Sequence, residues 1–169
     1  KDLTIVINES NPFDKLLNLI ALERNLEISP NEFEGVGILH PLWGLMKFYF
    51  KSNNAVCLTT GINIRKNMGK KYELEWDHIF PYSVLRDNGY DMNNRIKYQY
   101  AQEITNRAIL TAVANRTKSA QSAESYLAEV KEKFPNSLQL QCIPEDESIW
   151  KLENFEQFLK SRRQILADE

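Results

Sequence analysis

Two stretches decide the fold: YELEWDHIFP at 72–81 and NRAILTAVANRTKS at 106–119. In the first, apolar and polar residues alternate loosely, which predicts a strand that Pro81 ends. In the second, an apolar run predicts another strand over 106–110, and Thr111 is a good N-cap for a helix that follows. The pattern is therefore strand, long connection, strand and helix.

Asp77, His78 and Asn115 are the residue types that metal-assisted hydrolysis of a phosphodiester needs. Water must lose a proton near neutral pH, and histidine is the side chain best poised to accept it. A divalent cation must neutralise charge on the phosphate, and Mg²⁺ prefers oxygen ligands such as carboxylates and amides. Neighbouring strand residues point to opposite faces, so a regular strand could not direct both Asp77 and His78 at one site. We therefore expect the strand to end, twist or bulge at these two residues.

The segment 77–81, D-H-I-F-P, followed by 106–119, resembles HNH (ββα-metal) nucleases in their D-H-I-x-P form. That form is also seen in the HNH domain of RNA-guided CRISPR nucleases. The nine-residue step from Asn106 to Asn115, with Lys118 three residues later, fits it as well. The resemblance implies an α+β fold in which a ββα-metal (HNH) core is embedded in a mostly helical domain.

The resemblance also implies a role for each matching residue. His78 would be the general base that activates water, while Asp77 and Asn115 would bind Mg²⁺ or Mn²⁺. Asn106 would hold the loop and orient the base through backbone contacts. Lys118 would touch phosphate or stabilise the leaving oxygen. The chain would then be an endonuclease that nicks or cleaves DNA.

Weaker signals extend the resemblance to the C-terminal nuclease half of GmrSD-type restriction enzymes. These signals are the apolar helix that begins at His40 and Pro41, the helix that carries Ser122, and F-x-x-F-L-x-x-R at 155–162. Such enzymes are modification-dependent anti-phage nucleases with an N-terminal nucleotide-binding half. The resemblance therefore implies DNA as partner, a role in restriction, and a nucleotide-binding domain in a longer protein.

The composition is that of an ordinary globular protein, with 43% hydrophobic and 26% charged residues. We find neither a signal peptide nor an apolar run of about 18 residues, so no membrane association is expected. Cys57 and Cys142 are far apart and form no C-x-x-C pair, so no zinc is expected. Two lone cysteines indicate buried thiols in a reducing, cytoplasmic setting, with one disulfide as the alternative.

The net charge is −2, but the middle of the chain is basic. Residues 60–120 hold ten Lys or Arg against six Asp or Glu. A locally basic surface can meet phosphate, although a solvated face is the alternative interpretation. The candidates for DNA contact are Arg107, Arg116, Lys70 and Lys71, the last two within the basic run that also holds Arg65 and Lys66.

We expect one compact domain of three parts, excised from a longer protein. They are a helical N-terminal subdomain at 1–71, the HNH core at 72–120 and a C-terminal helical extension at 121–169. Helical spacing predicts helices over 11–26, 41–52, 122–134 and 152–165, a long ordered loop with some helix over 82–100, and an extended segment over 138–143.

Some residues and functions keep alternatives at this point. His40 is expected to cap a helix, whereas Glu75 would either bind the metal or face solvent. The chain could instead be a non-catalytic nucleic-acid-binding module on an HNH scaffold, but such a module would be expected to lose part of the Asp77, His78 and Asn115 set. A metal-dependent RNase is the third hypothesis. The sequence indicates no oligomeric state.

Overall fold

The structure is a computed structural model that describes residues 2–23, 25–64 and 73–169. It is a mixed α+β fold, which confirms the predicted class. Its strands are β1 (Leu74–His78) and β2 (Arg107–Thr111). Its α-helices are α1 (Asp2–Asn8), α2 (Pro12–Glu23), α3 (Pro41–Ser52), α4 (Tyr82–Asp87), α5 (Arg95–Ala101), α6 (Ala112–Lys118), α7 (Ala123–Lys133), α8 (Pro135–Leu140) and α9 (Phe155–Asp168).

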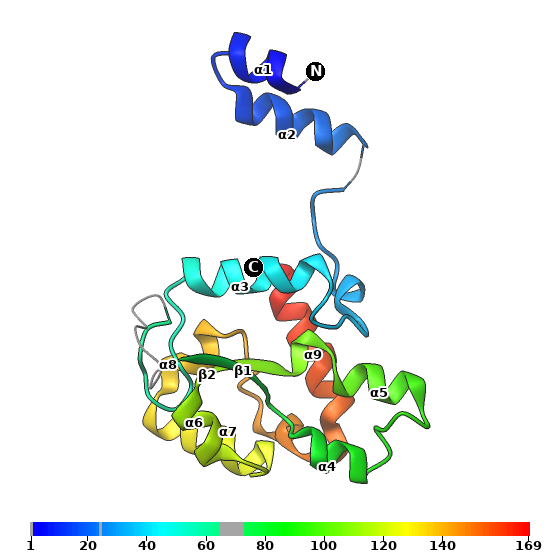
Figure 1. The fold of residues 1–169 in the computed structure, drawn as a ribbon, viewed down its shortest axis with the longest axis vertical. Coiled ribbons are helices and arrows are strands. Elements are labelled where there is room, and N and C mark those ends of the chain that lie inside the picture. Colours follow the sequence, from blue (N-terminus) through cyan, green and yellow to red (C-terminus); the bar gives the residue numbers. More distant parts are fainter. Residues whose placement is uncertain (1, 24, 65–72) are drawn as a thin grey trace.

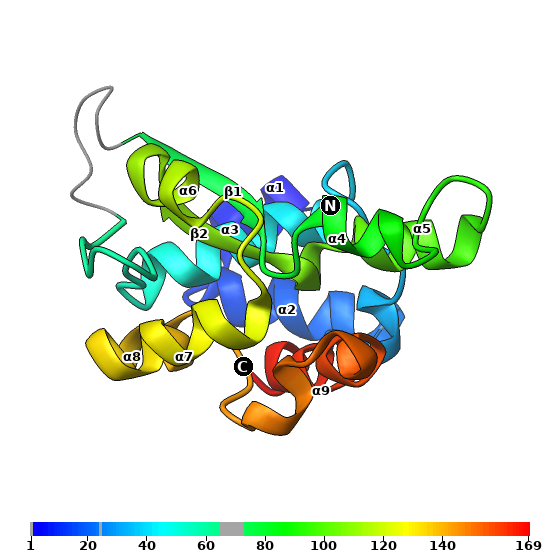
Figure 2. The same ribbon diagram turned by 90° about the horizontal axis from the view of Figure 1, so that it is seen from below.

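The two strands form an antiparallel sheet that lies between helices α3 and α6 (Figure 1). Trp76 pairs with Ile109, and His78 at the end of β1 pairs with Arg107 at the start of β2. β2 runs directly into α6, because the Thr111 side chain caps the helix by accepting a hydrogen bond from the Ala114 amide at 3.2 Å. After β1 the chain continues into α4 and α5, which extend beyond that end of the sheet (Figure 2).

The face of the sheet toward α3 is aromatic. The Trp76 ring lies 4.3 Å from the Trp43 ring and 6.1 Å from the Phe50 ring, between centroids. Helix α3 begins as its sequence predicts, with Pro41 in the first turn. His40 caps it, since its Nδ1 accepts a hydrogen bond from the Leu42 amide at 3.3 Å. The capping role expected for His40 is therefore confirmed.

Part of the free edge of β2 is covered by the buried side chain of Gln141. Its Oε1 accepts a hydrogen bond from the Ile109 amide at 2.7 Å, and its Nε2 donates to the Ile109 carbonyl at 3.0 Å. The same Nε2 donates to the Val56 carbonyl at 2.7 Å. Gln141 thus supplies the bonds that a third strand would make, which leaves this part of the edge satisfied.

Helix α9 is fixed to the start of β2 by the fully buried Arg162. Its guanidinium donates hydrogen bonds to the backbone carbonyls of Thr105, Arg107, Gln141 and Cys142, at 2.7–3.1 Å. Burial lowers the pKa of Arg162 to about 10, so the group still carries its charge at neutral pH. Four carbonyl dipoles replace water around that charge.

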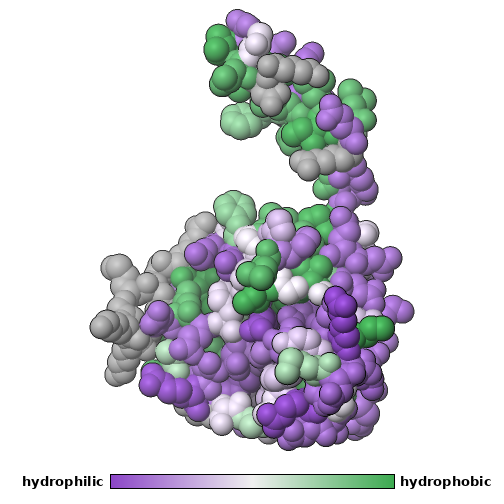
Figure 3. All heavy atoms as spheres, turned by 45° about the vertical axis from the view of Figure 1, so that its right-hand side comes forward, coloured by the Kyte–Doolittle hydropathy of each residue, from purple (hydrophilic) through white to green (hydrophobic). Residues whose placement is uncertain are grey.

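Helices α1 and α2 form an arm that stands away from the rest of the molecule (Figure 1). α2 has no buried residue, and apolar side chains such as Leu3, Phe13 and Leu22 are exposed. Figure 3 shows hydrophobic surface on the arm. The arm therefore adds nothing to the two hydrophobic clusters that hold the body together.

Two predictions about the secondary structure need correction. The extended segment predicted over 138–143 is wrong, because Pro135 starts α8 and the chain turns at Cys142, whose φ is 52°. The predicted loop over 82–100 is mostly helical, with α4 and α5 in it. Both thiols, Cys57 and Cys142, are buried and free, so the expected buried thiols are confirmed and the disulfide alternative is wrong.

Within the described ranges, no helix combines the length and the apolar character needed to cross a membrane.

Candidate active site

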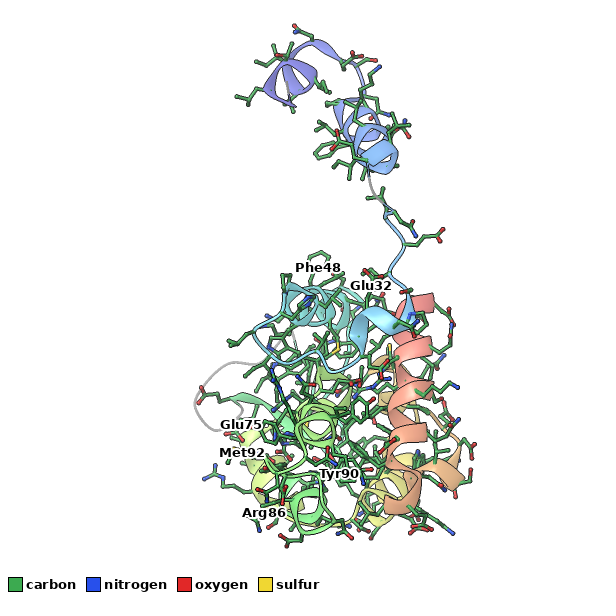
Figure 4. All side chains as sticks on the ribbon, turned by 90° about the vertical axis from the view of Figure 1, so that its right-hand side faces the viewer. Glu32, Phe48, Glu75, Arg86, Tyr90 and Met92 are labelled. Atoms are coloured by element: carbon green, nitrogen blue, oxygen red, sulfur yellow. The ribbon has the colours of Figure 1, made fainter. Side chains whose placement is uncertain are left out.

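The candidate site lies on the face of β1 that is covered by α6. Glu75 and Asp77 are two residues apart on the strand and share this face, while Asn115 and Lys118 are one turn apart on the helix. Figure 4 labels Glu75 at this position on β1. The short connection from β2 into α6 sets the helix against the strand, so residues some 40 positions apart come into contact.

Lys118 is the buried centre of this cluster. Its Nζ donates hydrogen bonds to Asp77 Oδ2 at 2.8 Å and to the His78 carbonyl at 2.6 Å. The Lys118 side chain is 1% exposed and that of Asp77 is 26% exposed. The ammonium also lies 5.4 Å from the centroid of the Tyr126 ring. A buried ammonium with these partners is compensated, and the carboxylate keeps access to solvent.

Asn115 makes the second contact across this face. Its Nδ2 donates a hydrogen bond to Glu75 Oε2 at 2.7 Å, so the amide is held beside the Glu75 carboxylate. Sequence reasoning left Glu75 between metal binding and solvent. The structure places it in direct contact with Asn115, the residue predicted to bind metal.

Asn106 is fully buried and holds the chain that follows β1. Its Oδ1 accepts a hydrogen bond from the Phe80 amide at 2.9 Å, and its Nδ2 donates to the carbonyls of Phe80 and Ala101 at 3.2 and 3.1 Å. Its own carbonyl accepts from the Ile79 amide at 2.8 Å. These are backbone contacts of the predicted kind; their effect on a base remains a prediction.

His78 lies at the last position of β1 and turns its ring away from Lys118. Its Nε2 is 3.3 Å from Oε1 of Gln102, and its ring lies 6.1 Å from that of Tyr82. Burial, with a further contribution from the Arg107 charge, lowers the pKa of His78 to about 4. The imidazole is therefore neutral at pH 7 and keeps a lone pair, but the same burial makes it a weaker proton acceptor than an exposed histidine.

The strand ends at His78, as expected, but it does so without a bulge. Pairing with β2 is regular through His78 and Arg107, so Asp77 and His78 keep opposite orientations. Asp77 faces α6, while His78 faces Gln102. Beyond the end of the strand, the Asn106 side chain holds the backbone of Phe80.

The side chains present fit Mg²⁺ or Mn²⁺ in kind. Asp77, Glu75 and Asn115 offer carboxylate and amide oxygens from one face, and the Asp77 carboxylate already holds a cation, the Lys118 ammonium. In the part of the chain that the structure describes, no three His, Cys, Asp or Glu side chains gather as a metal site. Mg²⁺ does not require such a group, since water and phosphate complete its coordination.

The four residues predicted to contact DNA have different positions. Arg107 is half-buried and donates from Nη1 to the Trp76 carbonyl at 3.4 Å and from Nη2 to Gln102 Oε1 at 3.1 Å. Arg116 is exposed on α6, with its Nε donating to the Ala112 carbonyl at 3.1 Å. Lys70 and Lys71 lie outside the described residues.

Sequence reasoning missed Gln102 and Tyr126. Gln102 lies just after the predicted loop of 82–100, and nothing in its local pattern marks it as a partner of His78. Tyr126 lies on the helix predicted over 122–134, and nothing in that pattern marks it as a partner of Lys118. Its hydroxyl is buried and has no hydrogen-bond partner among the described residues, although its ring lies beneath Lys118.

Compared with known proteins, the chain matches no family model, no curated protein and no solved structure.

Proposed function

We propose that this protein is a metal-dependent endonuclease of the HNH (ββα-metal) type that hydrolyses phosphodiester bonds in DNA. The observation that supports this most is the arrangement of β1, β2 and α6. It brings Asp77, Asn115 and Lys118 to one face, at the end of a strand that carries a neutral histidine. Two antiparallel strands followed by a helix is the order that a ββα-metal core would have, which supports the proposal.

The proposed reaction begins with a water at the end of β1. His78 accepts one proton from this water, and the hydroxide that results forms a new bond to phosphorus while one ester P–O bond breaks. The leaving oxygen then takes a proton from solvent. Asn106 keeps the chain after His78 in place, so the ring does not have to be ordered during the reaction.

The cation would be held by Asp77 and Asn115, with Glu75 beside them. When bound, Mg²⁺ or Mn²⁺ would neutralise charge on the phosphate and on the leaving oxygen. Lys118 balances the charge of Asp77 before the cation binds. Its second bond, to the His78 carbonyl, keeps the ammonium at the end of the strand. Because Lys118 is buried, it would reach a phosphate oxygen only by giving up one of these two partners.

The biological role that we propose is anti-phage restriction of modified DNA in the cytoplasm, together with a nucleotide-binding domain. This proposal is supported by the family resemblance of 77–81 and 106–119 and by the wider pattern around His40, Ser122 and 155–162. Arg116 on the exposed side of α6, with Lys70 and Lys71, would add phosphate contacts to the DNA interface.

A plasmid nicking assay with Mg²⁺ or Mn²⁺ tests the activity. We expect the wild type to relax supercoiled DNA, and His78→Ala to lower the rate by about 10²- to 10⁴-fold because the base is lost. His40→Ala is the matched control, since it removes the other histidine of the chain, which caps α3. We expect it to reduce stability by about 1 kcal/mol and to leave the rate unchanged.

Equal cleavage by the wild type and His78→Ala would contradict the role of His78. The same assay on RNA distinguishes the RNase hypothesis, which predicts cleavage of RNA and not of DNA. DNA binding without cleavage in either metal would favour the non-catalytic binding module.

A further inference from the structure

We infer that Gln102, held in place by Arg107, is a positioning residue that determines which ring nitrogen of His78 carries the proton. This inference rests on the proposed function, because it concerns the availability of His78 as a base. Gln102 would touch neither substrate nor metal. It would act through the imidazole alone.

The contacts of one atom, Gln102 Oε1, carry the inference. It lies 3.1 Å from Nη2 of Arg107 and 3.3 Å from Nε2 of His78. A guanidinium only donates hydrogen bonds, so the atom that faces Arg107 is the oxygen of the amide and not its nitrogen. The same oxygen can only accept from the ring. Nε2 of His78 therefore carries the proton, and Nδ1 keeps the lone pair.

The three residues Gln102, Arg107 and His78 are positioned by secondary-structure elements. Arg107 and His78 are paired residues at the same end of the sheet, and Arg107 also donates to the Trp76 carbonyl at 3.4 Å. Gln102 directly follows α5 as its C-cap, and its backbone amide donates to the Tyr98 carbonyl at 3.1 Å. All three side chains are half-buried, so water competes only partly for these bonds.

As a consequence, the same ring nitrogen of His78, Nδ1, is always the one that is free to accept a proton. A free imidazole exchanges its proton between the two nitrogens, and a ring with a proton on Nδ1 cannot accept another there. With Gln102 present, every neutral ring has Nδ1 ready. Arg107, which the sequence suggested as a DNA contact, would then serve His78 through Gln102.

Nitrogen NMR of the metal-free, DNA-free protein at pH 7.5 tests this inference directly. Correlations between ring protons and ring nitrogens identify the tautomer of each histidine, and His40 provides an internal comparison. We expect wild-type His78 to show a protonated Nε2 and an unprotonated Nδ1. We expect Gln102→Leu to show a mixture of both tautomers, and Gln102→Glu to keep the wild-type pattern, because a carboxylate also accepts from both donors.

A protonated Nδ1 in the wild type would overturn the inference, and so would a Gln102→Leu spectrum identical to that of the wild type. Gln102→Asn is a second variant, since it keeps the amide but is one methylene too short to reach the ring. We expect it to give the same mixture as Gln102→Leu. Thermal unfolding of each variant shows that the fold is retained.

Cleavage kinetics provide the second readout. We expect Gln102→Leu to lower kcat by about 10- to 100-fold with little change in KM, and Gln102→Glu to restore most of the rate. The two proposals fail separately. The expected nitrogen pattern without any cleavage by the wild type would contradict the nuclease proposal alone. Normal cleavage with an unchanged tautomer in Gln102→Leu would overturn the role of Gln102 alone.

Discussion

The two faces of β1 differ sharply in the side chains that they contact. Toward α3, Trp76 packs against the rings of Trp43 and Phe50. Toward α6, Glu75 and Asp77 contact the polar ends of Asn115 and Lys118. Successive residues of one short strand thus belong alternately to a hydrophobic cluster and to a cluster of charges.

This difference shows how a two-stranded sheet can support a polar site. A pair of strands alone is only marginally stable in water, and packing on one face must stabilise it. The aromatic face supplies that packing, which leaves the polar face free for the binding and catalysis that we propose. We therefore expect substitutions on the α3 side to reduce stability, and those on the α6 side to change metal binding and cleavage.

The largest expected effect on stability comes from the aromatic face. Phe50→Ala removes a fully buried ring and should lower the free energy of unfolding by about 3–5 kcal/mol, measured by urea denaturation. Phe48→Ala, on the same helix, is the control. Phe48 is 68% exposed (Figure 4), and its loss should change stability by less than about 0.5 kcal/mol. Equal losses for both variants would contradict the assignment of this face.

A smaller loss is expected on the polar face. Asp77→Asn removes the charge that compensates buried Lys118, and we expect a cost of about 1–3 kcal/mol by urea denaturation. Adding Lys118→Met to the same chain should recover most of this loss, because no buried charge then remains. A double variant whose loss equals the sum of the two single losses would show that the pair is not coupled.

Tyr126→Phe should have the smallest effect, and it should be stabilising. The variant removes a buried hydroxyl that has no partner in the described chain, so we expect a gain of about 1 kcal/mol. Tyr90→Phe is the matched control of opposite sign. Its hydroxyl (Figure 4) donates to Glu156 at 2.9 Å, and its removal loses that bond. A loss of stability in Tyr126→Phe would reveal a hydrogen-bond partner of its hydroxyl.

Local signals in the sequence were sufficient for several elements of the fold. Pro41 and His40 fix the start of α3, and Thr111 fixes the junction between β2 and α6. The segment 138–143 was mistaken for a strand because its apolar residues are also those of a short buried helix followed by a turn. The α1 helix was not predicted, and its packing against α2 is a tertiary feature.

Less of the site could be predicted than of the fold. The resemblance to HNH nucleases made Asp77, Asn115 and Lys118 the candidates, but the Lys118–Asp77 and Asn115–Glu75 contacts depend on how α6 packs on β1. The His78–Gln102 contact joins residues 24 positions apart, and it depends on the turn between α5 and β2. Pairings of this kind follow from tertiary geometry and leave no periodic signal in a single sequence.

The central claim is that the polar face of β1 holds a divalent cation, and Mn²⁺ binding measured by electron paramagnetic resonance tests it most directly. We expect the wild type to bind one Mn²⁺ per chain, Asn115→Ala to bind it more weakly, and Asp77→Asn to lose the site. Glu156→Gln, which removes a carboxylate far from β1 in sequence, should bind as the wild type does. No binding by the wild type, or equal binding by Asp77→Asn, would contradict the claim.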